Sequence, residues 1–170
     1  MSAKIKKYPG EGIRTADLRK GKVPVVKWKP KVRYAWSAGV AMSRFIEELK
    51  NGKIIARTCH KCGRVMVPPR MYCESCFRPT DEWTYVKDTG TINTYSVSYL
   101  AADASRLKDP ILVAVIDLDG ASKGMGILHY LGEMKKEDVD FGMKVKAVWK
   151  PKKERTGSIT DIRYFKPVEV

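Results

Sequence analysis

Two Cys-x-x-Cys pairs constrain this chain more than any other feature. All four cysteines fall within eighteen positions, as Cys59, Cys62, Cys73 and Cys76, and ten residues separate the two pairs. Each Cys-x-x-Cys turn aims two thiolates at one point, and a ten-residue connection is long enough for a hairpin that brings the two turns face to face. The pattern predicts one tetrahedral metal site, and zinc is the ion that such a site favours.

The same four ligands suit other chemistry less well. A mononuclear iron ion uses four thiolates too, and iron stays an alternative to zinc. A redox dithiol needs only one pair, and a disulfide framework would scatter its cysteines. Four thiolates close the coordination shell, whereas a catalytic zinc keeps a position for water, so we expect a structural ion. His60 lies inside the first turn and is expected at the surface. The basic residues that we expect to offset the negative tetrathiolate are Arg57, Lys61, Arg64, Arg70 and Arg78.

The charge of the chain is concentrated at one end. Its net charge of +14 favours an anionic partner, such as nucleic acid, a phosphorylated cofactor or an acidic protein. Residues 1–35 hold eleven Lys or Arg against two acidic residues, which gives +9 of that total. Turn signals such as Tyr8-Pro9-Gly10 interrupt this segment, and we find no sustained period of 2 or 3.6 in it. We interpret residues 1–35 as an extended basic arm, either solvated or lying along another surface.

Residues 36–53 carry the pattern of an amphipathic helix. Its apolar stripe at i, i+3, i+4 and i+7 consists of Met42, Phe45, Ile46 and Leu49. Ser37 is the predicted N-cap, and Asn51-Gly52 supplies the left-handed residue that ends many helices. We therefore expect a helix over residues 37–50, leading into a strand at residues 54–57.

After the second cysteine pair the pattern changes to short strands divided by turn signals. The predicted strands cover residues 83–86, 91–99, 111–118, 125–131, 145–149 and 159–165. Five of them, with one helical turn at residues 135–139, match a Greek-key barrel of the OB type, and a small β-sandwich is the alternative. The predicted fold is mainly β with an N-terminal helix: a rubredoxin-like zinc ribbon at residues 54–82, then a five-stranded OB-fold barrel at residues 83–170.

Residues able to run a reaction are few. His129 lies inside a predicted strand, so any triad would have to be built on it. Asp117 and Asp119 precede Gly120 and are expected to serve a turn. The sequence has no phosphate-binding loop and no dinucleotide fingerprint. It also has no long apolar run or apolar signal core, so we expect no membrane span and a cytoplasmic location. A binding or organising role is favoured over catalysis.

The order of these motifs resembles one family. The motifs are Leu49-Lys50-Asn51-Gly52-Lys53, Cys59-x-x-Cys62-Gly63, Pro68-Pro69-Arg70, Cys73-x-x-Cys76, Trp83, Gly90 and Gly142-Met143-Lys144-Val145. Together they resemble the zinc-ribbon plus OB-fold proteins catalogued as domain of unknown function 35. The resemblance covers roughly residues 36–168, and the arm at residues 1–35 is longer than the minimal family pattern.

The resemblance implies a non-catalytic partner of thiolase-superfamily enzymes. Archaeal members are similar in bridging an acetoacetyl-CoA thiolase and a hydroxymethylglutaryl-CoA synthase, which implies a scaffold of the mevalonate route. Other members accompany thiolase-like enzymes acting on steroid side chains or aromatic acyl groups. Chemistry would stay in the partner, while the barrel helps to enclose the pantetheine arm of an acyl-CoA. Arg70 and Lys123 are the candidates for binding coenzyme A phosphates.

Two other functions stay open from the residues alone. An OB barrel can bind RNA or single-stranded DNA by stacking bases on aromatic side chains. The aromatic candidates are Tyr85, Tyr95, Tyr99, Tyr130, Trp149, Tyr164 and Phe165. Acidic residues interspersed among the barrel strands argue against this function. An independent acyl-CoA thioesterase or acyltransferase would need a catalytic residue such as His129 or Asp117 in an acyl pocket.

Overall fold

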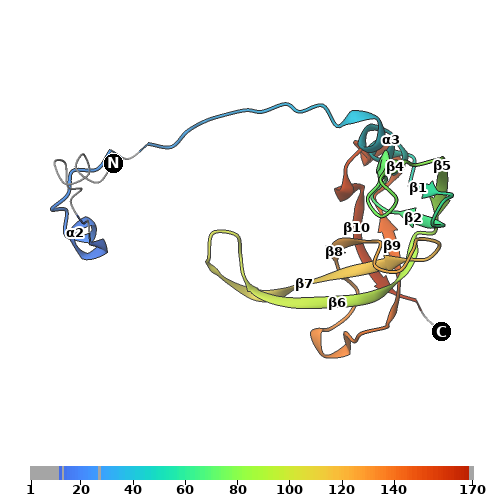
Figure 1. Ribbon diagram of the computed structural model, residues 1–170. Coiled ribbons are helices and arrows are strands. Elements are labelled where there is room, and N and C mark those ends of the chain that lie inside the picture. The colour runs from blue at the N-terminus through green and yellow to red at the C-terminus, as the bar shows by residue number, and fades with distance from the viewer. Residues whose placement is uncertain (1–11, 13, 27, 169–170) are drawn as a thin grey trace, which may run out of the picture. The chain divides into compact units, whose positions relative to one another are not determined.

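The computed structural model of the chain describes residues 12, 14–26 and 28–168 (Figure 1). Two compact units, Met1–Trp36 and Ser37–Val170, are described separately. The first unit contains a five-residue helix, α2 (Thr15–Arg19), where the sequence predicted only extended chain. Asp17 in its first turn and Arg19 in its last turn complement the helix dipole, which helps so short a helix to form. The predicted turn at Tyr8-Pro9-Gly10 lies outside the described residues.

The second unit begins with the predicted amphipathic helix, α3 (Gly39–Lys50). Ala38 takes the N-cap position that we assigned to Ser37, and the Ser37 hydroxyl instead accepts the N–H of Gly39 at 3.3 Å. The C-terminal end is as predicted, because Asn51 is the C-cap and Gly52 has a φ of +76°.

The buried face of α3 differs in part from the predicted apolar stripe. Its buried side chains are Ala41, Phe45 and Leu49, whereas Met42 is 37% exposed. No helix in the described part of the chain has both the length and the apolar character needed to cross a membrane.

Two small sheets build the ribbon. Strands β1 (Ile54–Cys59), β2 (Arg64–Met66) and β5 (Glu82–Val86) form an antiparallel sheet in the order β2-β1-β5. Strands β3 (Tyr72–Cys73) and β4 (Arg78–Pro79) form a separate antiparallel pair. β5 pairs with β1 over five residues, so the strand that follows the second cysteine pair is hydrogen-bonded to the ribbon.

Five strands form the barrel sheet, in the order β10-β9-β6-β7-β8. They are β6 (Thr89–Leu100), β7 (Arg106–Leu118), β8 (Gly126–Tyr130), β9 (Lys144–Trp149) and β10 (Ile162–Pro167). A parallel bridge between Leu131, directly after β8, and Phe165 within β10 closes the barrel. The 3₁₀ turn η1 (Lys136–Asp138) lies between β8 and β9, where one helical turn was predicted. The predicted fold class is confirmed.

The barrel departs from prediction at two places. The β6–β7 hairpin is longer than expected and projects beyond the other strands (Figure 1). Residues 159–161, predicted as strand, form the 3₁₀ helix η3 (Ile159–Asp161), which follows the 3₁₀ helix η2 (Lys152–Glu154). Ser158 and Asp161 form a capping box at its start, and such a local hydrogen-bond pattern competes with strand pairing.

One hydrophobic core joins helix, ribbon and barrel in the second unit. Phe45 and Leu49 of α3 and Ile54 of β1 belong to the same buried cluster as Ile116 and Phe165 of the barrel. Burial of such side chains stabilises a fold by about 1.5–3 kcal/mol each. The ribbon therefore sits on a packed base rather than on a flexible linker.

Candidate metal centre

Two similar turns carry the four cysteines. Strand β1 ends at Cys59, and the N–H of Gly63 then bonds the Cys59 carbonyl at 2.8 Å. Strand β3 ends at Cys73, and the N–H of Phe77 bonds the Cys73 carbonyl at 2.9 Å. Gly63 and Phe77 both have positive φ, of 71° and 50°. Each turn therefore folds back on itself and points its two thiols to the same side.

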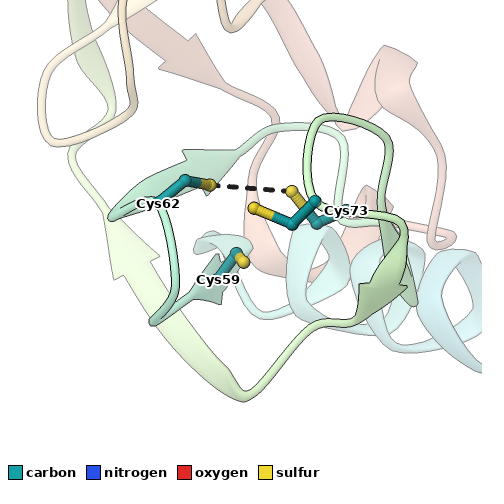
Figure 2. A group of neighbouring side chains, drawn as sticks. Cys59, Cys62 and Cys73 are labelled. Carbon is teal, nitrogen blue, oxygen red and sulfur yellow. Dashed lines mark hydrogen bonds between the residues drawn. The ribbon is translucent and has the colours of Figure 1, made fainter.

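The two turns face each other and bring the four sulfur atoms together. All four Sγ atoms lie within 4.8 Å of one another, and Cys62 Sγ is 3.6 Å from Cys73 Sγ (Figure 2). A tetrahedron with zinc–sulfur bonds of about 2.3 Å has sulfur–sulfur edges of about 3.8 Å. Cys59 and Cys73 are buried, while Cys62 is exposed. The zinc-ribbon domain thus has four cysteines positioned to bind a metal ion.

The thiols of this cluster differ in their electrostatic surroundings. The backbone N–H of Cys62 is the main influence on Cys59, and the pKa of the Cys59 thiol falls to about 6. Burial, with hydrogen bonds to the neighbouring thiols, raises the pKa of Cys76 to about 12. Thiolates this close together repel one another, whereas a bound divalent cation favours the thiolate form of each. The donor set fits such a cation.

Arginine side chains around the ribbon pair mainly with acids and backbone groups. Arg57 is buried, donates to Thr80 Oγ1 at 2.8 Å and lies 4.8 Å from the centre of the Trp83 ring. Arg64 Nη1 and Arg70 Nη1 lie 2.7 Å and 3.4 Å from the same oxygen, Glu74 Oε1. Arg57, Arg64 and Arg70 therefore connect segments of the ribbon to one another, while Arg78 interacts electrostatically with Cys59.

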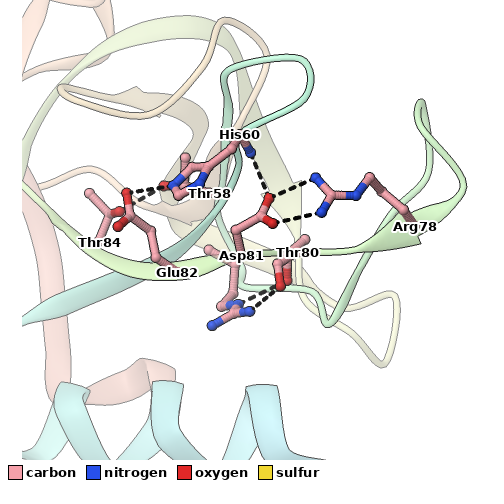
Figure 3. Close-up of polar contacts among 8 residues, drawn as sticks. Thr58, His60, Arg78, Thr80, Asp81, Glu82 and Thr84 are labelled. Carbon is pink, nitrogen blue, oxygen red and sulfur yellow. Dashed lines mark hydrogen bonds and ion pairs between the residues drawn. The ribbon is translucent and has the colours of Figure 1, made fainter.

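Asp81 connects the first cysteine turn to β4. Asp81 Oδ2 accepts the backbone N–H of His60 at 2.7 Å, and Arg78 donates to both carboxylate oxygens at 2.8 Å and 3.1 Å (Figure 3). The His60 N–H, followed by Arg78, holds the pKa of the Asp81 carboxyl below its usual range. Partners of this kind fix the orientation of metal ligands.

The side chain of His60 points to Glu82 and is 59% exposed, with Nε2 at 3.2 Å from Glu82 Oε1. We expect His60→Ala to keep the same metal content as the parent chain, since four sulfur ligands are already present. Elemental analysis of the purified variant measures this directly. Loss of metal would mean that the imidazole is a ligand.

The two candidates for coenzyme A binding lie on different loops. Arg70 follows β2 and faces Glu74, and Lys123 is exposed in the turn between β7 and β8. An apolar cavity of about 530 Å³ lies elsewhere, between β8 and β10. It is lined by Val113, Leu128, His129, Tyr130, Ile159 and Ile162, with Lys150 and Arg163 at its polar positions. Neither Arg70 nor Lys123 lines this cavity.

The residues considered for catalysis contact backbone groups and neighbouring polar side chains. His129 is buried, its Nδ1 accepts the N–H of Tyr130 at 2.9 Å, and its Nε2 is 3.2 Å from the carbonyl oxygen of Ile159. Burial lowers the pKa of the His129 imidazole, so the neutral ring is favoured. Asp117 Oδ2 accepts from Asn93 at 3.0 Å, whereas Asp117 Oδ1 is buried and has no hydrogen-bond partner among the described residues. Asp119 lies at the predicted turn and accepts from Thr89 at 2.6 Å. Both ring nitrogens of His129 are thus engaged by backbone groups.

The aromatic residues considered for base stacking are spread over several elements. Phe165 is in the core, Tyr164 donates to Glu133 at 2.6 Å, and Tyr85 donates from β5 to Glu48 of α3 at 2.9 Å. The ring of Phe165 is therefore not available for stacking, and carboxylates engage the hydroxyls of Tyr164 and Tyr85.

Residues of a barrel turn that pack beneath the cysteine cluster were not predicted from the sequence. The turn between β7 and β8 packs on the ribbon, where Ser122 Oγ accepts the N–H of Val65 at 2.9 Å. Met125 belongs to the same buried cluster as Cys59, Met66 and Cys73. These residues lie between 46 and 66 positions from the cysteines in sequence, and no local pattern marks them.

Two family profiles match this chain. The profile described as the ChsH2 rubredoxin-like zinc ribbon domain matches residues 47–82, and that of the ChsH2 C-terminal OB-fold domain matches residues 83–150. A protein of Methanocaldococcus jannaschii described as a DUF35 domain-containing scaffold protein is 35% identical over 119 residues. That match covers 68% of this chain and 82% of the relative.

Solved structures share the fold. A DUF35 protein of unknown function from Sulfolobus solfataricus is 29% identical, with a TM-score of 0.60 over 76% of this chain and 87% of that one. A structure described as an Ltp2-ChsH2(DUF35) aldolase is 18% identical, with a TM-score of 0.55 over 82% of this chain and 98% of that one. At that identity the second likeness concerns the fold alone.

Proposed function

This chain belongs to the DUF35 family of zinc-ribbon and OB-fold proteins, and from this membership we propose that it is a non-catalytic accessory subunit of an enzyme complex. It binds thiolase-superfamily enzymes, namely an acetoacetyl-CoA thiolase, a hydroxymethylglutaryl-CoA synthase or both. The observation that carries the proposal is the 35% identity to a scaffold protein. The complex would serve the mevalonate route in the cytoplasm.

The chemistry of the cysteine cluster supports a role without catalysis. In this proposal Cys59, Cys62, Cys73 and Cys76 bind one structural Zn²⁺, which cross-links the two turns and leaves no coordination position for substrate. His129, the histidine nearest to a cavity, is held by backbone groups at both nitrogens. The chain then contributes a rigid surface, and the reaction takes place in the partner.

Coenzyme A is the ligand that the partners would share. We place its phosphates near Arg70, an exposed cation within the ribbon, and Lys123, an exposed cation in the turn between β7 and β8. Guanidinium and ammonium groups hold phosphates by charge-assisted hydrogen bonds. Arg70 would exchange the Glu74 carboxylate for a phosphate when the ligand binds.

Reconstitution from purified components tests the proposal. The chain is mixed with the acetoacetyl-CoA thiolase and the hydroxymethylglutaryl-CoA synthase of the same organism, and the masses are measured by size-exclusion chromatography with light scattering. We expect a stable complex with at least one enzyme and no acyl-CoA hydrolysis by the chain alone. Absence of any complex, or hydrolysis by the isolated chain, would contradict the proposal.

The coenzyme A assignment gives a separate prediction. In the reconstituted complex, Arg70→Ala should weaken coenzyme A binding about five- to tenfold, because an exposed phosphate contact is lost. Isothermal titration with coenzyme A measures the change, and Lys61→Ala is the matched control for an exposed ribbon cation. Equal losses in both variants would mean that only general positive charge attracts the ligand.

A further inference from the structure

Residues 26–36 contain an alternation of apolar and basic residues, although no sustained period was predicted for residues 1–35. Every even position is apolar, and the residues are Val26, Trp28, Pro30, Val32, Tyr34 and Trp36. The odd positions between them are Lys or Arg, apart from Ala35. A period of 2 is the signature of a β-strand with one apolar face and one polar face. The segment therefore has a strand pattern of eleven residues.

Residues 26 and 28–36, the described part of this segment, form no strand, and their apolar side chains are exposed. Val26 is 95% exposed, Trp28 is 78% exposed and Trp36 is 86% exposed. The rings of Tyr34 and Trp36 lie side by side, with centroids 6.4 Å apart at an interplanar angle of 46°. Residues two apart thus share one face, as in a strand. A contiguous apolar face of this size is typical of a surface that is buried on binding.

The prolines indicate which edge of the segment can pair. Pro24 and Pro30 are both at even positions. In an extended strand, the N–H groups of successive residues point to opposite edges, and proline has no N–H to donate. The edge formed by the N–H groups of odd-numbered residues, such as Lys29, Lys31 and Arg33, therefore has all its donors. The edge formed by even-numbered residues lacks the donors of Pro24 and Pro30. A strand with one blocked edge is suited to the outside of a sheet.

The placement of the cations favours a protein partner over nucleic acid. Base stacking would engage Trp28, Tyr34 and Trp36, and the basic side chains would then point away from the strand that is stacked. Val26 and Val32 interrupt the aromatic face with groups on which bases do not stack. An apolar groove beside an open strand edge takes both aliphatic and aromatic groups, and acidic residues along its rim complement the opposite basic face.

We propose that residues 26–36 bind the partner enzyme as an added β-strand. The odd-numbered N–H groups pair with an exposed strand edge of the enzyme, the apolar face fills a groove about 35 Å long, and the basic face meets an acidic rim. This inference rests on the proposed function and names the element that makes the contact.

Two composition-matched variants of the full chain test the alternation. In the first, Trp28→Lys is combined with Lys29→Trp, which moves the indole to the basic face. In the second, Trp28→Val is combined with Val32→Trp, which keeps it on the apolar face. Affinities for the purified thiolase and synthase are measured by titration calorimetry. We expect the first variant to bind at least about 30-fold more weakly and the second to stay within about threefold of the parent chain.

Other results would overturn the inference. Parental affinity of the first variant would mean that the segment does not dock, although the enzyme complex itself would stand. Equal losses in both variants would mean that the face of the strand is irrelevant. Loss of binding to a fluorescent single-stranded RNA, with enzyme affinity unchanged, would assign the segment to nucleic acid. If the parent chain binds neither enzyme, the proposed function fails as well.

Discussion

Replacement of Cys73 by Ser is expected to release the metal and unfold the ribbon. Cys73 is buried, its sulfur lies 3.6 Å from that of Cys62, and it packs in the same cluster as Met66 and Met125. Structural zinc contributes about 10–16 kcal/mol to the folding of zinc-finger peptides, which is comparable to the whole stability of a typical domain. Loss of one of four ligands therefore removes the main cross-link of a segment that has little core of its own.

Metal analysis and hydrogen exchange check this expectation. The variant should hold less than one metal ion per chain, and amide protection should fall in β1, β2 and β3. Ser75→Ala is the control, because Ser75 lies in the same turn and contacts Arg64 without being a candidate ligand. Full metal content and unchanged protection in Cys73→Ser would contradict the ligand assignment. The same analysis separates zinc from iron in the parent chain.

Asp161→Asn is expected to lower the free energy of unfolding by about 2–3 kcal/mol at neutral pH. Asp161 is fully buried, and its carboxylate accepts the N–H groups of Thr156, Gly157 and Ser158 at 3.0 Å, 2.8 Å and 3.1 Å. In Asp161→Asn, the side-chain NH₂ group replaces one carboxylate oxygen. This NH₂ group is itself a donor, so it cannot accept the backbone N–H groups that it faces. Chemical denaturation followed by tryptophan fluorescence gives the difference.

The stability contributed by Asp161 depends on pH. Burial by itself would raise the pKa of this carboxyl, but the three N–H donors outweigh burial and hold the pKa below its usual range. A carboxyl with a lowered pKa in the folded state stabilises the fold above its unfolded pKa, near 3.9, and this contribution is lost as the pH falls through the folded pKa. The difference in the free energy of unfolding between the parent chain and Asp161→Asn should therefore be at its maximum at pH 6 and should shrink below about pH 4.

An exposed aspartate provides the comparison. Asp103 lies at the tip of the β6–β7 hairpin and accepts from Ser105 at 2.6 Å. Its pKa is also lowered, mainly by Ser105, yet water can replace that contact, so Asp103→Asn should change stability little. If the difference in the free energy of unfolding between the parent chain and Asp161→Asn stays constant down to pH 2, the proposed charge dependence is contradicted.

The features that the sequence predicts best are those that depend only on residues close together along the chain. The cysteine turns follow from Cys-x-x-Cys, and the end of α3 follows from Gly52, because each depends on residues within one turn of the chain. The OB-type barrel could be inferred from the number of predicted strands and the one helical turn between them. The bridge between Leu131 and Phe165, which closes the barrel, agrees with that prediction. Recognition of the family order added the link to enzyme partners, which spacing alone does not contain.

Features that depend on tertiary contact were not predictable in this way. Ser122 and Met125 reach the ribbon from a barrel turn, and nothing near them in sequence marks that contact. Residues 159–161 have the composition of a strand, but the buried carboxylate of Asp161 gathers three N–H groups and bends the chain. The alternation at residues 26–36 is present in the sequence itself, but Pro24 and Pro30 favour a prediction of turns there. Both prolines lie at even positions, on the apolar face of the alternation, so they are compatible with a strand.

Identification of the proteins that remain bound to the chain in its own cells tests the central claim most directly. The untagged chain is purified gently from native extract, treated with nuclease and analysed by mass spectrometry with quantified stoichiometry. The scaffold proposal predicts a thiolase or a hydroxymethylglutaryl-CoA synthase in stoichiometric amount, unaffected by nuclease. Recovery of nuclease-protected RNA or DNA alone, with no acyl-CoA enzyme, would contradict it.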